Sequence, residues 1–159
     1  MNKYDWLLFL HMTGAFLFLG AAVVAVVLNV AAQLRDRPSE IALLLRLISF
    51  SVAGFAAGFL LLLVFGLWLV HDAGYGYGDG WIVAALVLFV LSNVLGGIGG
   101  ERSKPARKLA EQLAATGDAP SAELTRLLRS PVPMVLNYGA GLLAFAVLAL
   151  MIWKPGAGG

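Results

Sequence analysis

The chain carries histidines and methionines whose side chains can bind a metal ion or haem iron. His11 and His71 are its only histidines, and each lies near one edge of a long apolar run. Neutral imidazole binds haem iron and copper, and the thioether of methionine binds haem iron or Cu(I). Two histidines on separate helices at matching depth can hold a b-type haem between them. Together with Met12 or Met151, which lie at similar depth, they can alternatively hold a copper ion.

A purely structural role for both histidines is the alternative. His71 ends the second apolar run on a helical face different from the one that carries the glycine pair of that run. His11 lies about 7–8 Å inside the first run, at 1.5 Å per residue. There it could instead hydrogen-bond to a neighbouring backbone group, or to Tyr75 or Tyr77 in the outer loop, which follows the second run.

A strongly apolar chain has to position these side chains. Of its 159 residues, 60% are hydrophobic and 13% are charged, about half the charged fraction of a typical soluble domain. The apolar residues gather into long runs, which is typical of an integral membrane protein. The absence of cysteine excludes disulfides and thiolate metal sites. Because the basic residues lie between the apolar runs, we expect a lipid bilayer around the chain and no nucleic-acid partner.

Four apolar runs are long enough to cross the hydrocarbon core, which takes roughly 20 residues. They cover about residues 6–32, 47–71, 81–100 and 133–153. The first run is too long for the hydrophobic region of a signal peptide. We therefore predict a single all-α domain, residues 1–159, folded as an integral membrane antiparallel four-helix bundle.

Lysine and arginine predict how this bundle is oriented. The loops after the first and third spans carry nine of the eleven basic residues, and only Lys3 and Lys154 lie near the termini. Because cytoplasmic loops are enriched in Lys and Arg, we expect both long loops in the cytoplasm and both termini outside. All four tryptophans then lie at the outer interface, where indole rings anchor membrane proteins.

Small residues and asparagines predict where the spans pack against each other, because helices in lipid associate through close packing and hydrogen bonds. The second span carries Gly54-x-x-x-Gly58, and the third carries Gly96 and Gly100. Three spans each have an asparagine in the cytoplasmic half, and we expect these to bond to one another: Asn29, Asn93 and Asn137. The spans contain no acidic residue, which argues against a proton-coupled transporter.

The loop of residues 101–132 contains two short amphipathic stretches. In the first, apolar residues recur at helical spacing between Pro105, suited to a first helical turn, and Gly117, suited to a stop. The second stretch, residues 124–128, precedes Pro131. We predict two short cytoplasmic helices that lie on the leaflet with basic residues near anionic lipid. A docking surface for a partner is the alternative.

The stretches FLHMTGAFLFLGAAV and GLWLVHDAGYGYGDGWIVAALVLFVLS resemble a family of uncharacterised bacterial four-helix integral membrane proteins. That family is a domain of unknown function near the copper-resistance protein D group. The resemblance covers about residues 4–153 and implies a multi-pass protein of the bacterial inner (cytoplasmic) membrane. The histidine-containing opening resembles HemJ-type protoporphyrinogen oxidases more loosely, which implies haem ligation by His11. The basic residues that HemJ-type proteins place inside the membrane have no equivalent here, so the resemblance implies haem binding rather than oxidase activity.

The function favoured by these observations is binding of haem b, or secondarily of copper, at the outer side of the bundle. Its role would be electron transfer or cofactor handling. His11 is the expected axial ligand, with His71 or Met151 as the second, and a copper site would add Met12. The competing function is a cofactor-free structural or accessory subunit that contacts another membrane protein or a second copy of itself. A third option is an enzyme of haem metabolism.

Overall fold

The computed structural model describes residues 2–156, which form five helices and no strand. In chain order these are α1 (Lys3–Gln33), α2 (Pro38–Asp72), α3 (Gly80–Ala115), α4 (Ala122–Leu128) and α5 (Pro131–Trp153). The predicted all-α class is confirmed for these residues. The ends of the predicted domain, residue 1 and residues 157–159, lie outside the described residues.

Local sequence explains where several helices begin and end. The Asn2 side chain accepts a hydrogen bond from the Asp5 N–H, and the Asp5 carboxylate accepts one from the Asn2 N–H, both at 2.9 Å. This reciprocal pair is a capping box for α1. α2 and α5 begin with Pro38 and Pro131, because a first-turn residue needs no N–H donor. α5 ends at Trp153, and the capping residue Lys154 has a φ of 41°, in the left-handed region.

Four helical segments of residues 2–156 are long and apolar enough to cross a membrane. They are α1, α2, α3 and the stretch Ala122–Trp153, which joins α4 to α5. α5 alone is about 35 Å long at 1.5 Å per residue, and the hydrocarbon core is about 30 Å thick. Many large apolar side chains on these helices are exposed, among them Phe16 and Leu142, as contact with lipid requires. The prediction of four helical segments long and apolar enough to span a membrane is confirmed.

Two of the long helices extend further than predicted. α2 begins at Pro38 rather than near residue 47, and α3 continues to Ala115 rather than ending near residue 100. Each is therefore about 53 Å long, roughly 20 Å more than the hydrocarbon thickness. The first of the two predicted loop helices is the last third of α3, so the prediction of a separate helix there is wrong. The second predicted stretch is helical and forms α4.

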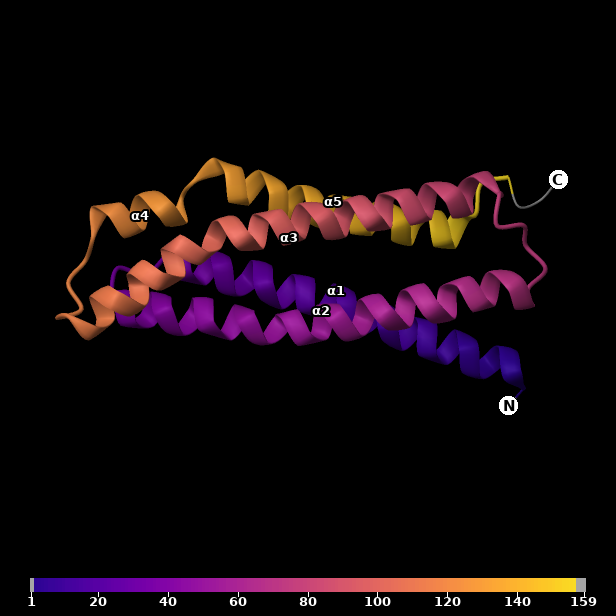
Figure 1. Cartoon of the computed structure of the whole chain (residues 1–159), viewed down its shortest axis with the longest axis horizontal. Coiled ribbons are helices and arrows are strands. Elements are labelled where there is room, and N and C mark those ends of the chain that lie inside the picture. The colour runs from indigo at the N-terminus through magenta and orange to yellow at the C-terminus, as the bar shows by residue number, and fades with distance from the viewer. Residues whose placement is uncertain (1, 157–159) are drawn as a thin grey trace.

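Pro105 lies inside α3 without ending it. A proline within a helix removes one N–H donor and bends the axis, and α3 bends over its last third (Figure 1). Ala106 and Ala110, which follow the proline, are buried against Ile41 and Leu45 of α2. This burial of apolar surface stabilises the helix beyond the bend.

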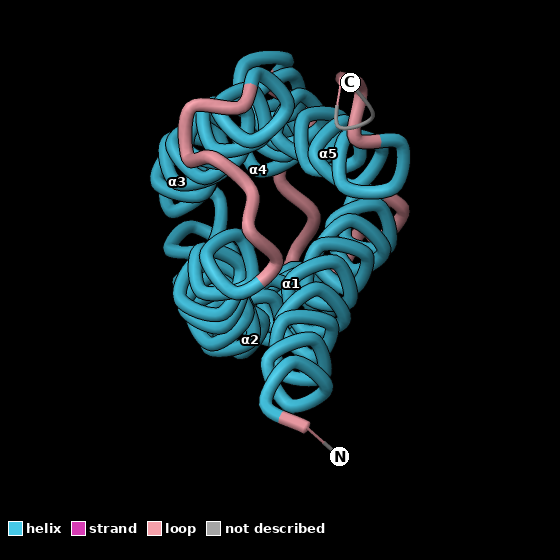
Figure 2. Tube along the Cα trace, turned by 90° about the vertical axis from the view of Figure 1, so that its right-hand side faces the viewer, coloured by secondary structure: helices cyan, strands magenta, loops and turns pink. Residues whose placement is uncertain are grey.

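The long helices form two closely packed pairs, α1 with α2 and α3 with α5, and α2 also contacts α3 (Figure 1). Viewed along the bundle, the first pair lies below the second (Figure 2). Aromatic rings join the pairs near mid-bundle. The Phe18 ring centre lies 5.4 Å from that of Phe89, which in turn stacks on Phe59 at 5.3 Å. Both described chain ends lie at one end of the bundle, which we call the terminal end (Figure 1).

Small and polar residues bring α3 and α5 close together. The buried Ser92 hydroxyl donates a hydrogen bond of 2.8 Å to a backbone carbonyl of α5. Gly99 is buried directly against the side-chain amide of Asn137, where a Cβ atom would overlap it. Gly100 has no neighbouring atom where its Cβ would be. The α3 glycines that face α5 are therefore Gly96 and Gly99, and the prediction for Gly100 is wrong.

The three intramembrane asparagines do not bond to one another as predicted. Asn29 accepts a hydrogen bond of 2.8 Å from Gln33 on α1. Asn93 donates one of 2.7 Å to the carbonyl four residues earlier on α3, and Asn137 packs against α3. Two of the three are satisfied within their own helices, because residues four apart are neighbours on a helix surface.

A second apolar cluster joins four helices at the end opposite the terminal end. Its buried members are Ala32, Ile41, Leu45, Ala106, Ala110 and Leu124. The nine Lys and Arg residues that follow the first and third spans lie on the segments around this cluster. We call this part of the bundle the basic end. The cluster gives the parts of α2 and α3 that lie beyond their apolar runs a small core of their own.

Candidate functional site

His11 lies one turn before the closest helix crossing in α1 and α2. Gly14 and Gly58 are both buried at this crossing. A Cβ atom on Gly14 would lie 2.7 Å from the Leu61 Cβ, and one on Gly58 would lie 2.7 Å from the Phe18 backbone nitrogen. Only glycine permits this approach. The packing role predicted for the second-span glycines is confirmed.

The His11 imidazole packs against α2 at a third glycine. Its Nδ1 atom lies 3.2 Å from the Leu62 carbonyl oxygen. A Cβ atom on Gly66 would lie 3.0 Å from Cε1 of the ring and 3.1 Å from Nδ1. Gly66 therefore makes room for the ring beside the Leu62 carbonyl. In a regular helix this carbonyl also accepts the backbone N–H of Gly66. Of the alternatives for His11, the hydrogen bond to a neighbouring backbone group is confirmed.

The acceptor determines the tautomer of the His11 ring. A carbonyl oxygen can only accept a hydrogen bond, so Nδ1 carries the hydrogen and Nε2 of the neutral ring keeps its lone pair. A histidine that binds a metal commonly donates its other N–H to a backbone carbonyl or carboxylate, which fixes the ring orientation. The geometry of His11 fits that of one protein ligand.

The other ligands predicted from the sequence lie on different surfaces. His71 is exposed and follows Leu62 by nine residues, or about two and a half helical turns, so it lies on the opposite side of α2. Met12 is exposed on α1, and Met151 is half-buried near the end of α5, which packs against α3. Within residues 2–156, no three His, Cys, Asp or Glu side chains gather as a metal site would require.

Two lysines order the terminal end through contacts that were not predicted from the sequence. Lys3 Nζ lies 2.6 Å from Asp72 Oδ1 and 5.4 Å from the centre of the Trp68 ring. Lys154 Nζ lies 5.2 Å from the centre of the Tyr75 ring. The first contact joins the first turn of α1 to the last turn of α2. The sequence contained a signal for these contacts. One lysine lies near each terminus, and aromatic residues are expected at the same membrane interface, where they can stack with a lysine.

The comparisons with known proteins bear on the whole chain. Residues 5–155 match the family described as predicted integral membrane protein (DUF2269). The chain belongs to this family. Membership confirms the resemblance to an integral membrane family of unknown function. The DUF2269 match does not extend to the copper-resistance protein D group or to HemJ-type proteins, and neither resemblance is supported. No curated protein and no solved structure matches the chain.

In this DUF2269 protein, the loop between α3 and α4 caps the start of α2. Asp118 Oδ1 accepts a hydrogen bond of 2.6 Å from the Ser39 N–H, and its Oδ2 accepts one of 2.7 Å from the Ser39 hydroxyl. A carboxylate is favourable at a helix N-terminus. The two hydrogen bonds from Ser39 are the main reason that the pKa of the Asp118 carboxyl lies below its ordinary value. The nearby positive charge of Arg37 lowers this pKa further, by a smaller amount.

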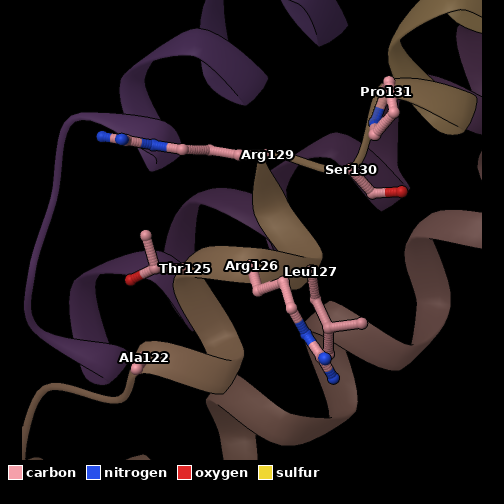
Figure 3. A pocket seen from close by; sticks show the side chains of 7 residues that line it. All are labelled: Ala122, Thr125, Arg126, Leu127, Arg129, Ser130 and Pro131. Atoms are coloured by element: carbon pink, nitrogen blue, oxygen red, sulfur yellow. The ribbon is translucent and has the colours of Figure 1, made fainter.

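A concavity of about 600 Å³ lies beside α4 at the basic end. It is lined by Ala122, Thr125, Arg126, Leu127, Arg129, Ser130 and Pro131. The guanidinium groups of Arg126 and Arg129 point in different directions (Figure 3). Because its two strongest donors do not converge on one point, this surface is poorly suited to binding a single small anion.

Proposed function

We propose that this membrane protein binds haem b, with His11 as an axial ligand. One observation supports the assignment: Nδ1 of His11 faces the Leu62 carbonyl at 3.2 Å, so the lone pair of the neutral ring is on Nε2. Gly66 and the Leu62 carbonyl hold the ring in one orientation, as a ligand of fixed geometry requires.

The donor set favours haem over a copper ion. A porphyrin supplies four ligands to its iron, so the protein needs to provide only one or two. A copper site built from side chains needs several converging donors. The absence of a three-residue His, Cys, Asp or Glu group within residues 2–156 and the exposure of Met12 therefore disfavour copper.

We assign this chain one ligand, His11, because Met151 and His71 lie on other surfaces; of these two, Met151 is the more enclosed. Met151 is half-buried near the terminal end, whereas His71 is exposed on the side of α2 that faces away from the Leu62 carbonyl. A bound haem b would supply one-electron chemistry. The part of this chain would be to hold the iron through Nε2 of His11 and to exclude water around it.

The same proposal includes the orientation of the bundle in a bacterial inner membrane. The terminal end faces the outside and the basic end the cytoplasm, because nine of eleven Lys and Arg residues belong to the latter. The chain has no cysteine, so Tyr77→Cys and Glu123→Cys each introduce a single thiol. A membrane-impermeant maleimide added to intact spheroplasts is expected to label Tyr77→Cys only. Labelling of Glu123→Cys alone would reverse the orientation.

The haem proposal is tested by absorption spectra of protein purified in mild detergent from haem-replete cells. The wild-type protein is expected to show a Soret band that sharpens on reduction with dithionite. His11→Ala removes this band, and His71→Ala, the matched control, retains it. A colourless wild-type protein, or an unchanged spectrum in His11→Ala, would overturn the proposal.

A cofactor-free accessory subunit is the second candidate function, and the basic end favours it. Leu124, 1% exposed, holds α4 against α1, α2 and α3, so this end presents ordered arginines outside the hydrocarbon region. Crosslinking in native membranes with a photoreactive residue at Arg126 is expected to give one discrete adduct if the surface binds a partner subunit. The absence of any adduct rules out this candidate.

A further inference from the structure

A groove lies between α2 and α3 at the basic end, with a volume of about 550 Å³. It is lined by Ser39, Ala42, Leu43, Arg46, Ser49, Arg107, Glu111 and Ala114. Unlike the concavity beside α4, this groove is formed by two long helices that pack together through the apolar cluster of the basic end. The two helices that form its walls, α2 and α3, are therefore held in a fixed position relative to each other.

The two arginines of the groove have unused hydrogen-bonding capacity. Arg107 Nε is buried and has no hydrogen-bond partner; it forms an ion pair with Glu111 Oε1 at 3.9 Å, which is too long for a hydrogen bond. Arg46 is exposed and forms no ion pair with any residue from 2 to 156. An anionic group between the helices would give the buried N–H an acceptor and would accept charge-assisted bonds from both guanidinium groups.

The surroundings of Arg46 indicate an amphipathic ligand. Arg46, Leu47 and Phe50 follow Leu43 by three, four and seven residues, so the four side chains lie along one side of α2. The three apolar ones are exposed. Arg46 directly precedes the apolar run of α2 that begins at Leu47. It therefore lies at the level where phospholipid phosphates meet the hydrocarbon core, with apolar surface on the membrane side.

We propose that this groove binds the phosphate headgroup of an anionic phospholipid. Arg46 and Arg107 contact the phosphate oxygens, since a guanidinium group presents a planar fork of donors to phosphate. The acyl chains lie against Leu47 and Phe50. The site is separate from His11, which lies toward the terminal end, so its existence does not depend on haem binding.

The test measures lipid binding to the full-length protein after delipidation in a neutral detergent. Phosphatidylglycerol, phosphatidylcholine and inorganic phosphate are titrated separately, and binding is followed by native mass spectrometry and by the unfolding temperature. We expect phosphatidylglycerol to bind and to raise the unfolding temperature. The double variant Arg46→Gln/Arg107→Gln loses two charge-assisted contacts. We expect it to bind phosphatidylglycerol about tenfold or more weakly than the wild type.

The matched control is Arg129→Gln, which removes the same charge at the same end but outside the groove. It is expected to bind phosphatidylglycerol within about twofold of wild type, since a distant surface charge contributes little. The single variant Arg46→Gln changes an exposed side chain and keeps the test valid if the double variant fails to fold. Equal binding by wild type and Arg46→Gln, equal binding of phosphatidylcholine, or equal effects of inorganic phosphate would each overturn the proposal.

Discussion

Gly14 of α1 and Gly58 of α2 face each other so closely that neither can carry a side chain. A Cβ atom on Gly14 would lie 3.2 Å from the Gly58 carbonyl oxygen, and one on Gly58 would lie 2.9 Å from the Gly14 carbonyl oxygen. This reciprocal contact sets the distance between the helices that hold His11 and Leu62. The orientation of the imidazole therefore depends on a packing contact one turn away.

Gly58→Ala is expected to destabilise the protein, because its new methyl group meets backbone atoms of α1 that cannot rotate away. Overpacking of this kind typically lowers the free energy of unfolding by about 1–3 kcal/mol. Gly20→Ala is the control, since nothing lies within 4 Å of its added Cβ atom. Unfolding by sodium dodecyl sulfate in mixed micelles measures both variants. Equal stability of the two would contradict the close crossing.

Gly66→Ala is expected to displace the His11 ring rather than to disrupt the helix. The added methyl group would lie 3.0 Å from Cε1 and 3.1 Å from Nδ1 of the ring, so the ring must shift by a few tenths of an ångström, which weakens its hydrogen bond to the Leu62 carbonyl. Weakening of that hydrogen bond is expected to lower stability by up to about 0.5–1.5 kcal/mol. Nitrogen NMR of the labelled imidazole should show a smaller population of the protonated Nδ1 tautomer. Gly97→Ala, which adds a methyl group in open space, should leave the spectrum unchanged.

Asp118 makes the stability of the basic end dependent on pH. Its pKa is lowered in the folded state by the hydrogen bonds from Ser39. The carboxylate therefore contributes stability that is fully present above the pKa of an unfolded aspartate and is lost as the pH falls through the folded pKa. As the pH falls below about 4, the ordinary pKa of an unfolded aspartate, the wild type is expected to lose more stability than Asp118→Asn.

Thermal unfolding across this pH range measures the difference, with Asp36→Asn as the charge-matched control. Asp36 lies in the exposed connection between α1 and α2. Parallel pH profiles for the wild type and Asp118→Asn would contradict the role of Asp118 as the cap of α2.

Leu124→Ala is expected to release α4 from the bundle. Leu124 is the only buried residue of α4, and removing a buried leucine side chain typically costs about 2–5 kcal/mol. Trypsin should then cleave faster after Arg126 and Arg129, because local unfolding exposes the backbone. Leu34→Ala, at a leucine that is 76% exposed, should leave the cleavage rate unchanged. Equal rates in both variants would mean that α4 is held by other contacts.

Much of the fold was predictable because it depends on local composition. The length of an apolar run determines whether a helix can cross the membrane. The predicted second loop helix agrees with α4 because Ser121 and Leu124 form a local capping and burial pattern. The first loop helix was misplaced because Pro105 follows glycines, a pattern that normally separates helices. Burial of Ala106 and Ala110 against α2 outweighed that local preference.

The sequence by itself determined the four apolar spans, the concentration of basic residues at one end and the scarcity of ligand side chains. These properties follow from which residues are present and how they are spaced. Only the tertiary structure decided that His11 meets Leu62 and Gly66. The reason is that His11 and Leu62 are 51 residues apart, so their contact depends on the register of two helices. That register is set by the packing of Gly14 against Gly58, a relation between segments that no local pattern encodes.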